Sequence, residues 1–145
     1  MTKVNVIKSI NISAQDAWEK LSSFEGIEHF SPIARSATEG QGVGTSRSCF
    51  MPDDSEIKER LTKLDNANMH LEYIILSGPF SFTDYVSNVF VKAIDDNNCE
   101  VSWGSAFNTE AETEMKSLLE GFYNVMIEGL EALIKSSADL VEDKA

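Results

Sequence analysis

Alternation of apolar and polar residues predicts strands near both ends of the chain. Close to the N-terminus, apolar side chains recur at every second position except Lys8, namely at Val4, Val6, Ile10 and Ile12. Between residues 99 and 108, one face collects Cys99, Val101, Trp103, Ser105 and Phe107. A period of two places alternate side chains on one face of a strand, so both segments predict strands with one buried and one solvated face.

Two short helical segments are predicted after the first strand. The hydroxyl of Ser13 can cap a helix start, and Asp16 adds favourable negative charge to the first turn. Trp18 marks the apolar side of this helix. A second helical segment is expected over residues 24–30, and Pro32 ends it.

Clusters of turn residues recur at intervals between residues 33 and 108. Glycine, asparagine and aspartate tolerate the backbone angles that tight hairpins require. The clusters are Gly40–Gly44, Pro52–Asp54, Asp65–Asn68, Ser77–Pro79 and Asp95–Asn98. They separate six strand-like runs, and the N-terminal strand brings the total to about seven. This spacing predicts an antiparallel meander.

A long amphipathic helix is predicted near the C-terminus, with Thr109 as its cap. Apolar residues recur at helical spacing at Met115, Leu118, Leu119, Phe122, Met126, Leu130 and Leu133. Over residues 111–136 the helix would be roughly 39 Å long, and only the concave face of the sheet is broad enough to receive it. Residues 1–137 are therefore expected to form one domain, and residues 138–145 a frayed, charged tail.

Composition and charge narrow the class of protein. The 145 residues are 42% hydrophobic, which is typical of one packed domain. The net charge of −12 argues against binding to nucleic acid or to anionic membranes. The N-terminal residues do not match a secretory signal, and no apolar run is long enough for stable membrane insertion. Cys49 and Cys99 lie in strand-like runs, so we expect buried, reduced thiols in a cytoplasmic protein.

Several motifs, taken in order, resemble a known fold. They are Ile10–Trp18, Gly42–Arg47, Ile57–Leu61, Gly78 and Pro79 with Tyr85, and Val101–Trp103 with Phe107. Over nearly the whole chain they resemble the helix-grip fold of the START-like and birch-pollen-allergen-like superfamily, in its polyketide cyclase/dehydrase (SRPBCC) branch. The resemblance implies an α+β fold with a curved seven-stranded antiparallel sheet, two short helices and one long C-terminal helix. This superfamily includes lipid carriers, hormone receptors and cyclases, so the fold alone does not decide the function.

A helix laid on a strongly curved sheet encloses space that side chains need not fill, and ligand pockets are typically apolar with a few polar groups. The candidate lining residues are Leu119, Phe122 and Met126 from the helix; Tyr73, Tyr85, Trp103 and Phe107 from the sheet; and Phe24, Ile27 and Phe30 from the short helical segments. The resemblance places the last three at the pocket mouth. The alternative is that all of these residues pack a solid core.

Arg47 and Glu59 are the polar candidates for a ligand anchor. Glu59 alternates with Ile57 and Leu61, so the three side chains should share a face. On the inner face, a carboxylate must be paired or protonated, and Arg47 on a neighbouring strand can pair with it. The alternative is a surface ion pair of little energetic value. Tyr73 and Tyr85 are expected either to donate hydrogen bonds to a ligand or to serve as amphipathic core residues.

These features favour binding or transport of a small hydrophobic molecule, either lipid-like or similar to an aromatic polyketide. One alternative is a polyketide cyclase/dehydrase-type enzyme, but among Glu59, Asp84, Tyr73 and Tyr85 nothing selects a catalytic residue. A second alternative is a protein-interaction module that uses the acidic helix face. No cofactor or metal is expected, because the histidines lack the spacing of metal ligands and the glycine run precedes a strand rather than a helix.

Overall fold

The computed structural model describes residues 1–143, with side chains up to residue 137. The described residues form seven strands, two α-helices and one 3-10 helix, joined by loops. In chain order they are β1 (Thr2–Ile10), α1 (Ala14–Ser22), the 3-10 helix η1 (Ile27–His29), β2 (Arg35–Glu39), β3 (Ser46–Phe50), β4 (Glu56–Asp65), β5 (His70–Ser77), β6 (Thr83–Asp95), β7 (Asn98–Asn108) and α2 (Glu112–Asp143).

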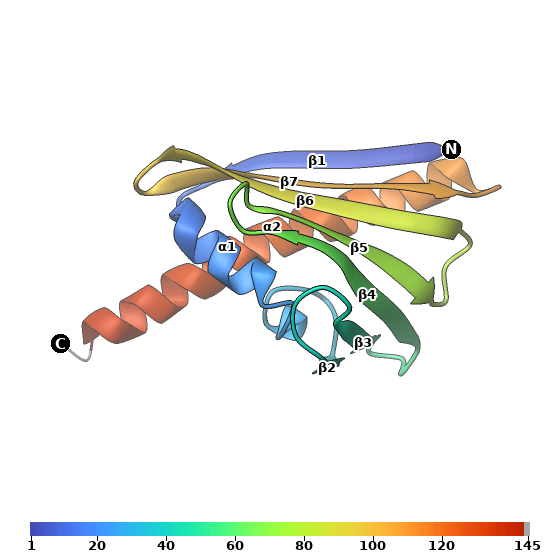
Figure 1. The fold of residues 1–145 in the computed structure, drawn as a ribbon, viewed down its shortest axis with the longest axis horizontal. Coiled ribbons are helices and arrows are strands. Elements are labelled where there is room, and N and C mark those ends of the chain that lie inside the picture. The colour runs from blue at the N-terminus through green and yellow to red at the C-terminus, as the bar shows by residue number, and fades with distance from the viewer. Residues whose placement is uncertain (144–145) are drawn as a thin grey trace.

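The strands form one antiparallel sheet in the order β1-β7-β6-β5-β4-β3-β2. Strands β2 to β7 follow one another as hairpins, and β1 completes the sheet by pairing with β7. Figure 1 shows α2 crossing this sheet obliquely, and the helix contacts β1, β7, α1 and η1. This is the helix-grip arrangement that the sequence predicts.

The alternating pattern of the sequence is confirmed by burial. In β1 and just after it, Val4, Val6, Ile10 and Ile12 are buried, and all five apolar-face residues of β7 are buried as well. Both cysteines are free thiols with no exposed surface. Each predicted turn cluster lies at or between the ends of two successive strands, so all five connect neighbouring strands of the meander.

The helix after β1 forms as predicted, but the second helical segment is shorter than expected. The Ser13 hydroxyl accepts a hydrogen bond from the Asp16 amide at 3.1 Å, which caps α1. The second segment was expected over residues 24–30, yet only the single turn η1 is helical. Phe24 and Gly26 have φ angles of 59° and 67°, in the left-handed region, and residues in that conformation interrupt a right-handed helix.

The face of α2 that meets the sheet differs slightly from the predicted stripe. Leu119, Met126 and Leu130 are buried, as expected, but Leu118 is 43% exposed. Tyr123 and Ile127 take part in the buried face instead. The helix continues past the expected end at Ser136 to Asp143. Residues 144–145 and the side chains from residue 138 lie outside the described part, so the frayed tail stays a prediction.

A close backbone approach positions α2 over the chain that follows η1. A Cβ atom on Gly129 would lie 2.5 Å from the carbonyl oxygen of Phe30 and 3.0 Å from its carbonyl carbon. Only glycine has no side chain to collide with this backbone. Gly121, two turns earlier in the same helix, has nothing within 4 Å of such an atom.

Two glycine-to-alanine variants test this contact. Gly121→Ala should stabilise the protein by about 0.5–1 kcal/mol, because alanine has the higher helix propensity. Gly129→Ala should instead destabilise it by about 1–3 kcal/mol, because the added methyl group overpacks the interface. Urea unfolding measures both free energies. Equal stabilisation by the two substitutions would contradict the close approach of α2 to Phe30.

Candidate functional site

A small cavity of about 40 Å³ lies between α2 and the inner face of the sheet. Among its lining residues are Glu59, Tyr73 and Tyr85 from the strands and Ile27, Leu119, Phe122 and Met126 from the helices, all predicted from the sequence. This volume has room for a few water molecules and is far smaller than the roughly 300–1,000 Å³ of a typical ligand pocket. The interior is therefore almost filled by its own side chains.

A second, smaller cavity of about 10 Å³ lies on the other side of Tyr73. Its lining includes Phe24, Phe30, Arg47 and Trp103, which the sequence analysis also named. The side chain of Tyr73 belongs to the walls of both cavities. The two cavities are therefore neighbours that share the Tyr73 side chain.

An ion pair is buried beside these cavities. Arg47 on β3 lies directly opposite Glu59 on β4 in the strand register. The Arg47 Nε donates a hydrogen bond of 2.7 Å to Glu59 Oε1, and the two side chains are 5% and 8% exposed. The alternative of a surface ion pair is therefore wrong. Glu59 shares a face with Ile57 and Leu61, as its alternation with them predicts, and the structure shows that this face is the inner one.

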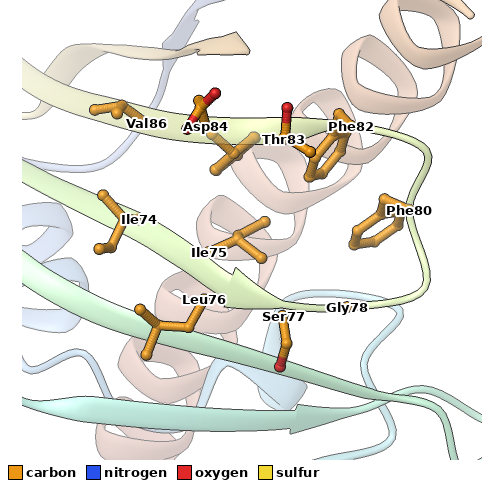
Figure 2. A pocket seen from close by; sticks show the side chains of 11 residues that line it. Ile74, Ile75, Leu76, Ser77, Gly78, Phe80, Phe82, Thr83, Asp84 and Val86 are labelled. Carbon is orange, nitrogen blue, oxygen red and sulfur yellow. The ribbon is translucent and has the colours of Figure 1, made fainter. Parts of the chain in front are cut away.

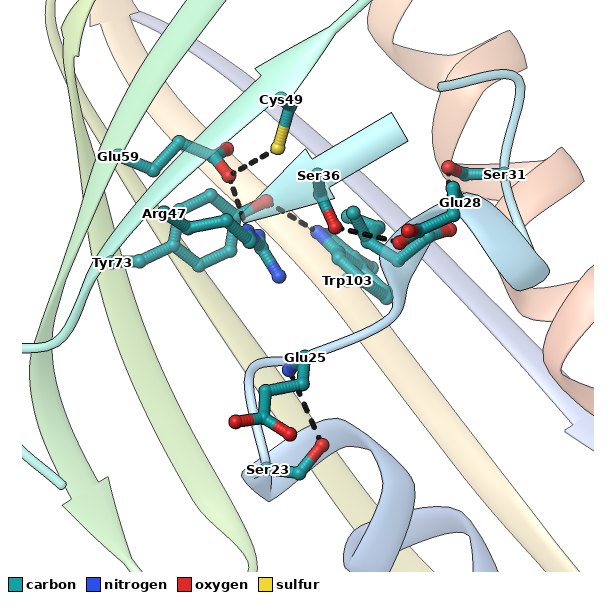
Figure 3. Close-up of polar contacts among 11 residues, drawn as sticks. Ser23, Glu25, Glu28, Ser31, Ser36, Arg47, Cys49, Glu59, Tyr73 and Trp103 are labelled. Carbon is teal, nitrogen blue, oxygen red and sulfur yellow. Dashed lines mark hydrogen bonds and ion pairs between the residues drawn. The ribbon is translucent and has the colours of Figure 1, made fainter. Parts of the chain in front are cut away.

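Aromatic rings and a thiol complete the surroundings of this pair (Figure 3). The guanidinium carbon of Arg47 lies 3.7 Å from the ring centroid of Phe24 and 5.5 Å from that of Tyr73. The Cys49 thiol donates to Glu59 Oε1 at 3.4 Å. A cation held over ring faces gains electrostatic stabilisation, which offsets part of the cost of removing it from water.

Burial and the charges of the pair together set the protonation of the groups around it. Burial, the largest single influence, lowers the pKa of Arg47, but the charge and hydrogen bond of Glu59, together with Cys49 and Tyr73, raise it overall. Burial, and then the negative charge of Glu59, raise the pKa of the Cys49 thiol far above its ordinary value. Cys49 therefore stays protonated, and it lacks the thiolate form that acts as a nucleophile.

The three tyrosines of the chain, Tyr73, Tyr85 and Tyr123, all have their side chains in this interior. Tyr123 donates a hydrogen bond to Ser105 Oγ at 2.7 Å, and its hydroxyl also pairs with that of Tyr85. Trp103 Nε1 donates to the Tyr73 hydroxyl at 3.1 Å. Burial raises the pKa of all three phenols. They are neutral at physiological pH, so they act as hydrogen-bond donors and acceptors rather than as bases.

A larger groove of about 590 Å³ opens on the sheet where β5 and β6 diverge (Figure 2). Phe80 and Phe82 from the connecting loop line it, together with Ile75 and Leu76 from β5. The side chain of Tyr85 lines both this groove and the interior cavity. The groove and the cavity thus share part of their lining.

The sequence as a whole matches a family of known proteins. The family model described as "Polyketide cyclase / dehydrase and lipid transport" matches residues 1–140. The chain belongs to this family. The family match confirms the resemblance drawn from the motifs. The interior described above is therefore that of a member of this family.

Solved structures share the fold of this family member. Protein XoxI from Bacillus cereus is 26% identical with a TM-score of 0.82, and the match covers 91% of this chain and 94% of that one. An uncharacterised protein from Bacillus thuringiensis is 25% identical with a TM-score of 0.82, covering 90% and 97%. Norcoclaurine synthase from Thalictrum flavum, in complex with dopamine and hydroxybenzaldehyde, is similar in fold, at 18% identity and a TM-score of 0.75, covering 93% and 87%. A comparison with curated proteins finds no match.

Three residues predicted at the pocket mouth are buried, and a fourth predicted pocket residue lines neither cavity. Phe24, Ile27 and Phe30 were expected at a pocket mouth, but their exposed fractions are 3%, 2% and 5%. They are interior because Phe24 lies against Arg47 and the Phe30 backbone lies against Gly129. Phe107 is buried but lines neither cavity; its ring stacks on Tyr85 at 6.2 Å.

Six residues that line the 40 Å³ cavity were not among the predicted pocket residues, namely Ile33, Ile57, Ile75, Phe80, Leu118 and Tyr123. Tyr123 follows Leu119 by four residues and precedes Met126 by three, so its helical spacing was a usable signal. Phe80 lies in the loop after β5, where no periodic pattern exists to reveal its orientation.

The described residues do not suggest a metal centre or a membrane span. Within them, no three histidine, cysteine or acidic side chains are grouped closely enough to hold an ion. Among the same residues, no helix combines the length and apolar composition needed to cross a bilayer.

The buried ion pair can be tested by removing one charge. Glu59→Gln leaves the Arg47 charge buried without a counter-charge and should destabilise the fold by about 3 kcal/mol in urea unfolding. Asp54→Asn is the matched control, because it removes the acid of the exposed pair with Arg35, whose separation is 3.8 Å. It should have little effect.

The double variant Arg47→Met/Glu59→Leu should recover most of the stability lost in Glu59→Gln, because an apolar pair needs no counter-charge. It also keeps the test interpretable if the single variant does not fold. A Glu59→Gln protein as stable as Asp54→Asn would contradict the buried pair.

Alkaline titration tests the environment of the tyrosines. Their folded pKa values exceed the value of about 10 for an unfolded phenol, so the stability they contribute is present below that pH and is lost as the pH rises above it. Near-ultraviolet absorbance should show almost no tyrosinate near pH ~10. All three phenols should ionise in one step, together with the loss of far-ultraviolet circular dichroism. A phenol that ionises near its ordinary pKa in the folded protein would refute their burial.

Proposed function

We propose that this protein binds one small apolar molecule, lipid-like or aromatic, in the space between α2 and the sheet. The observation that carries the proposal is the composition of the 40 Å³ cavity. Apolar side chains such as Leu119, Phe122 and Met126 share its wall with Glu59 and with the hydroxyl-bearing Tyr123. A ligand pocket combines these two properties, an apolar surface and a few polar groups that orient the ligand.

A ligand can bind only if the cavity enlarges. Part of the cavity wall is exposed, and side chains there have space into which they can move. Phe80 and Phe122 are half-buried, and Leu118 is 43% exposed, so these side chains have open space beside them. Phe80 also lines the outer groove, so its displacement connects the cavity with that groove, whose volume lies in the range of known ligand pockets. The side chains that hold the ion pair remain in place.

The polar groups suit a ligand with a hydroxyl or carbonyl group. The neutral phenols of Tyr85 and Tyr123 can exchange their mutual hydrogen bond for one to a ligand. Arg47 and Cys49 both contact Oε1 of Glu59, which leaves Oε2 to accept from a ligand hydroxyl. Norcoclaurine synthase, a protein of the same fold, is described in complex with dopamine and hydroxybenzaldehyde, and both are small aromatic molecules of this kind.

Binding is favoured over catalysis by the protonation of the same groups. The buried phenols and the Cys49 thiol have raised pKa values, so they are poor bases and poor nucleophiles at neutral pH. Glu59 is engaged by Arg47. The cyclase/dehydrase alternative rests on the family description alone, and the interaction-module alternative rests on the acidic composition alone.

Substitutions at Phe122 test where a ligand binds. The neutral dye N-phenyl-1-naphthylamine fluoresces more strongly in apolar surroundings, so a titration gives its affinity. Phe122→Trp should weaken binding by about tenfold or more, because overpacking the cavity costs about 1–3 kcal/mol. Phe122→Ala should strengthen it, because it enlarges the cavity.

Val125→Trp is the matched control, since Val125 lies on the exposed side of α2 at 47% exposure. Its affinity for the dye should equal that of the unsubstituted protein, and circular dichroism should show the same fold for all variants. Equal affinities for all four proteins, or no binding by the unsubstituted protein, would overturn the proposal.

A further inference from the structure

Inside the sheet, the neighbouring strands β5 and β6 separate from each other at one end. These strands pair from His70 opposite Phe90 to Ile74 opposite Val86. Beyond Ile74, β5 pairs only with β4 and β6 pairs only with β7. Figure 2 shows the two strands separating toward the loop of residues 78–82. No ladder of backbone hydrogen bonds closes the sheet in this gap.

An irregularity in β6 accompanies the opening. Asp84 has a φ angle of 54°, and the pairing of β6 with β7 shifts register between Thr83 and Val86. Asn108 Nδ2 donates to Asp84 Oδ2 at 3.0 Å and holds this segment to β7. Such a bulge bends a strand and changes the direction of its side chains. Tyr85 follows directly and is buried among the cavity residues.

The outer groove and the inner cavity have a wall in common. Ile75, Phe80 and Tyr85 line both spaces. These shared side chains therefore lie between the groove of about 590 Å³ and the interior. Side chains change rotamer in picoseconds to nanoseconds at exposed positions, much faster than a paired strand can separate from its neighbour.

Ile75 and Tyr85 belong to strands, whereas Phe80 is the residue of this shared wall that lies in the loop. It is half-buried, and its ring stacks on that of Phe82 with 5.0 Å between centroids. A Cβ atom on Gly78 would lie 3.3 Å from Phe80 Cδ2, so the absence of a side chain at Gly78 makes room for the ring. The Thr109 hydroxyl donates to the Ser81 carbonyl at 2.6 Å and anchors the loop backbone. The ring can thus move while the loop stays in place.

We propose that the gap between β5 and β6 is the entrance through which a small planar apolar ligand reaches the cavity, and that the Phe80 ring is its plug. This inference rests on the proposed function, because an entrance has meaning only if a ligand binds inside. The groove supports a planar molecule, since the rings of Phe80, Phe82 and Tyr85 stack in series from the groove toward the interior, with centroids 5.0 and 5.1 Å apart. The competing route passes Leu118 on α2, which also lines the cavity.

Stopped-flow fluorescence with N-phenyl-1-naphthylamine tests the route, because a plug affects rates more than affinity. Phe80→Ala should raise both the association and the dissociation rate constants by about tenfold, since ligand binding is slow when a conformational change must precede it. Gly78→Ala should raise both rates by a smaller factor, because its methyl group displaces the ring. Gly78→Ala keeps the test available if Phe80→Ala does not fold.

Phe90→Ala is the matched control: Phe90 is 44% exposed on β6 and lies outside the groove and the cavity. It should leave both rates unchanged, and Leu118→Ala should accelerate association less than Phe80→Ala. If Leu118→Ala alone accelerates binding, or if all variants have equal rates, the entrance between β5 and β6 is wrong. The proposed function still stands in that case, provided that the unsubstituted protein binds the dye at equilibrium. Absence of equilibrium binding in the unsubstituted protein would overturn both.

Discussion

Packing of the apolar face of α2 against the inner face of the sheet controls the shape of the interior. The helix reaches this position because Gly129 lets it approach the backbone of Phe30. Leu119, Tyr123 and Met126 then meet the inward side chains of the strands. The curvature of the sheet keeps the two layers from closing completely. The remaining space is small, so function depends on which side chains along its wall can move.

Polar groups inside this contact restrict what the interior can do. The Arg47–Glu59 pair, the rings of Phe24 and Tyr73, and the tyrosine hydroxyls satisfy one another. Among the described residues, every buried side-chain nitrogen or oxygen has a hydrogen-bond partner. A ligand that displaces one of these hydrogen bonds must replace it with an equivalent one, which favours a molecule that carries a hydroxyl or carbonyl group over a pure hydrocarbon.

The pattern of the sequence predicted the elements better than their contacts. Alternation in β1 and β7 marked the buried faces, because a strand repeats every two residues whatever it packs against. The helical stripe was correct at Leu119 and Met126 but included the exposed Leu118 and omitted Tyr123. Apolar character alone does not set the rotation of a helix about its axis; the partner surface does.

Local periodicity and backbone preference encode the order of the elements, the turns between strands and the shared face of Ile57, Glu59 and Leu61, so these features could be predicted from the amino-acid sequence. Three-dimensional contacts were needed to show that Arg47 and Glu59 are buried together, that Phe24 and Phe30 lie inside rather than at a mouth, and that Phe80 lines both the groove and the cavity. These properties depend on contacts between residues distant in the chain. No local pattern encodes the curvature of the sheet or the divergence of β5 from β6, which together create those contacts.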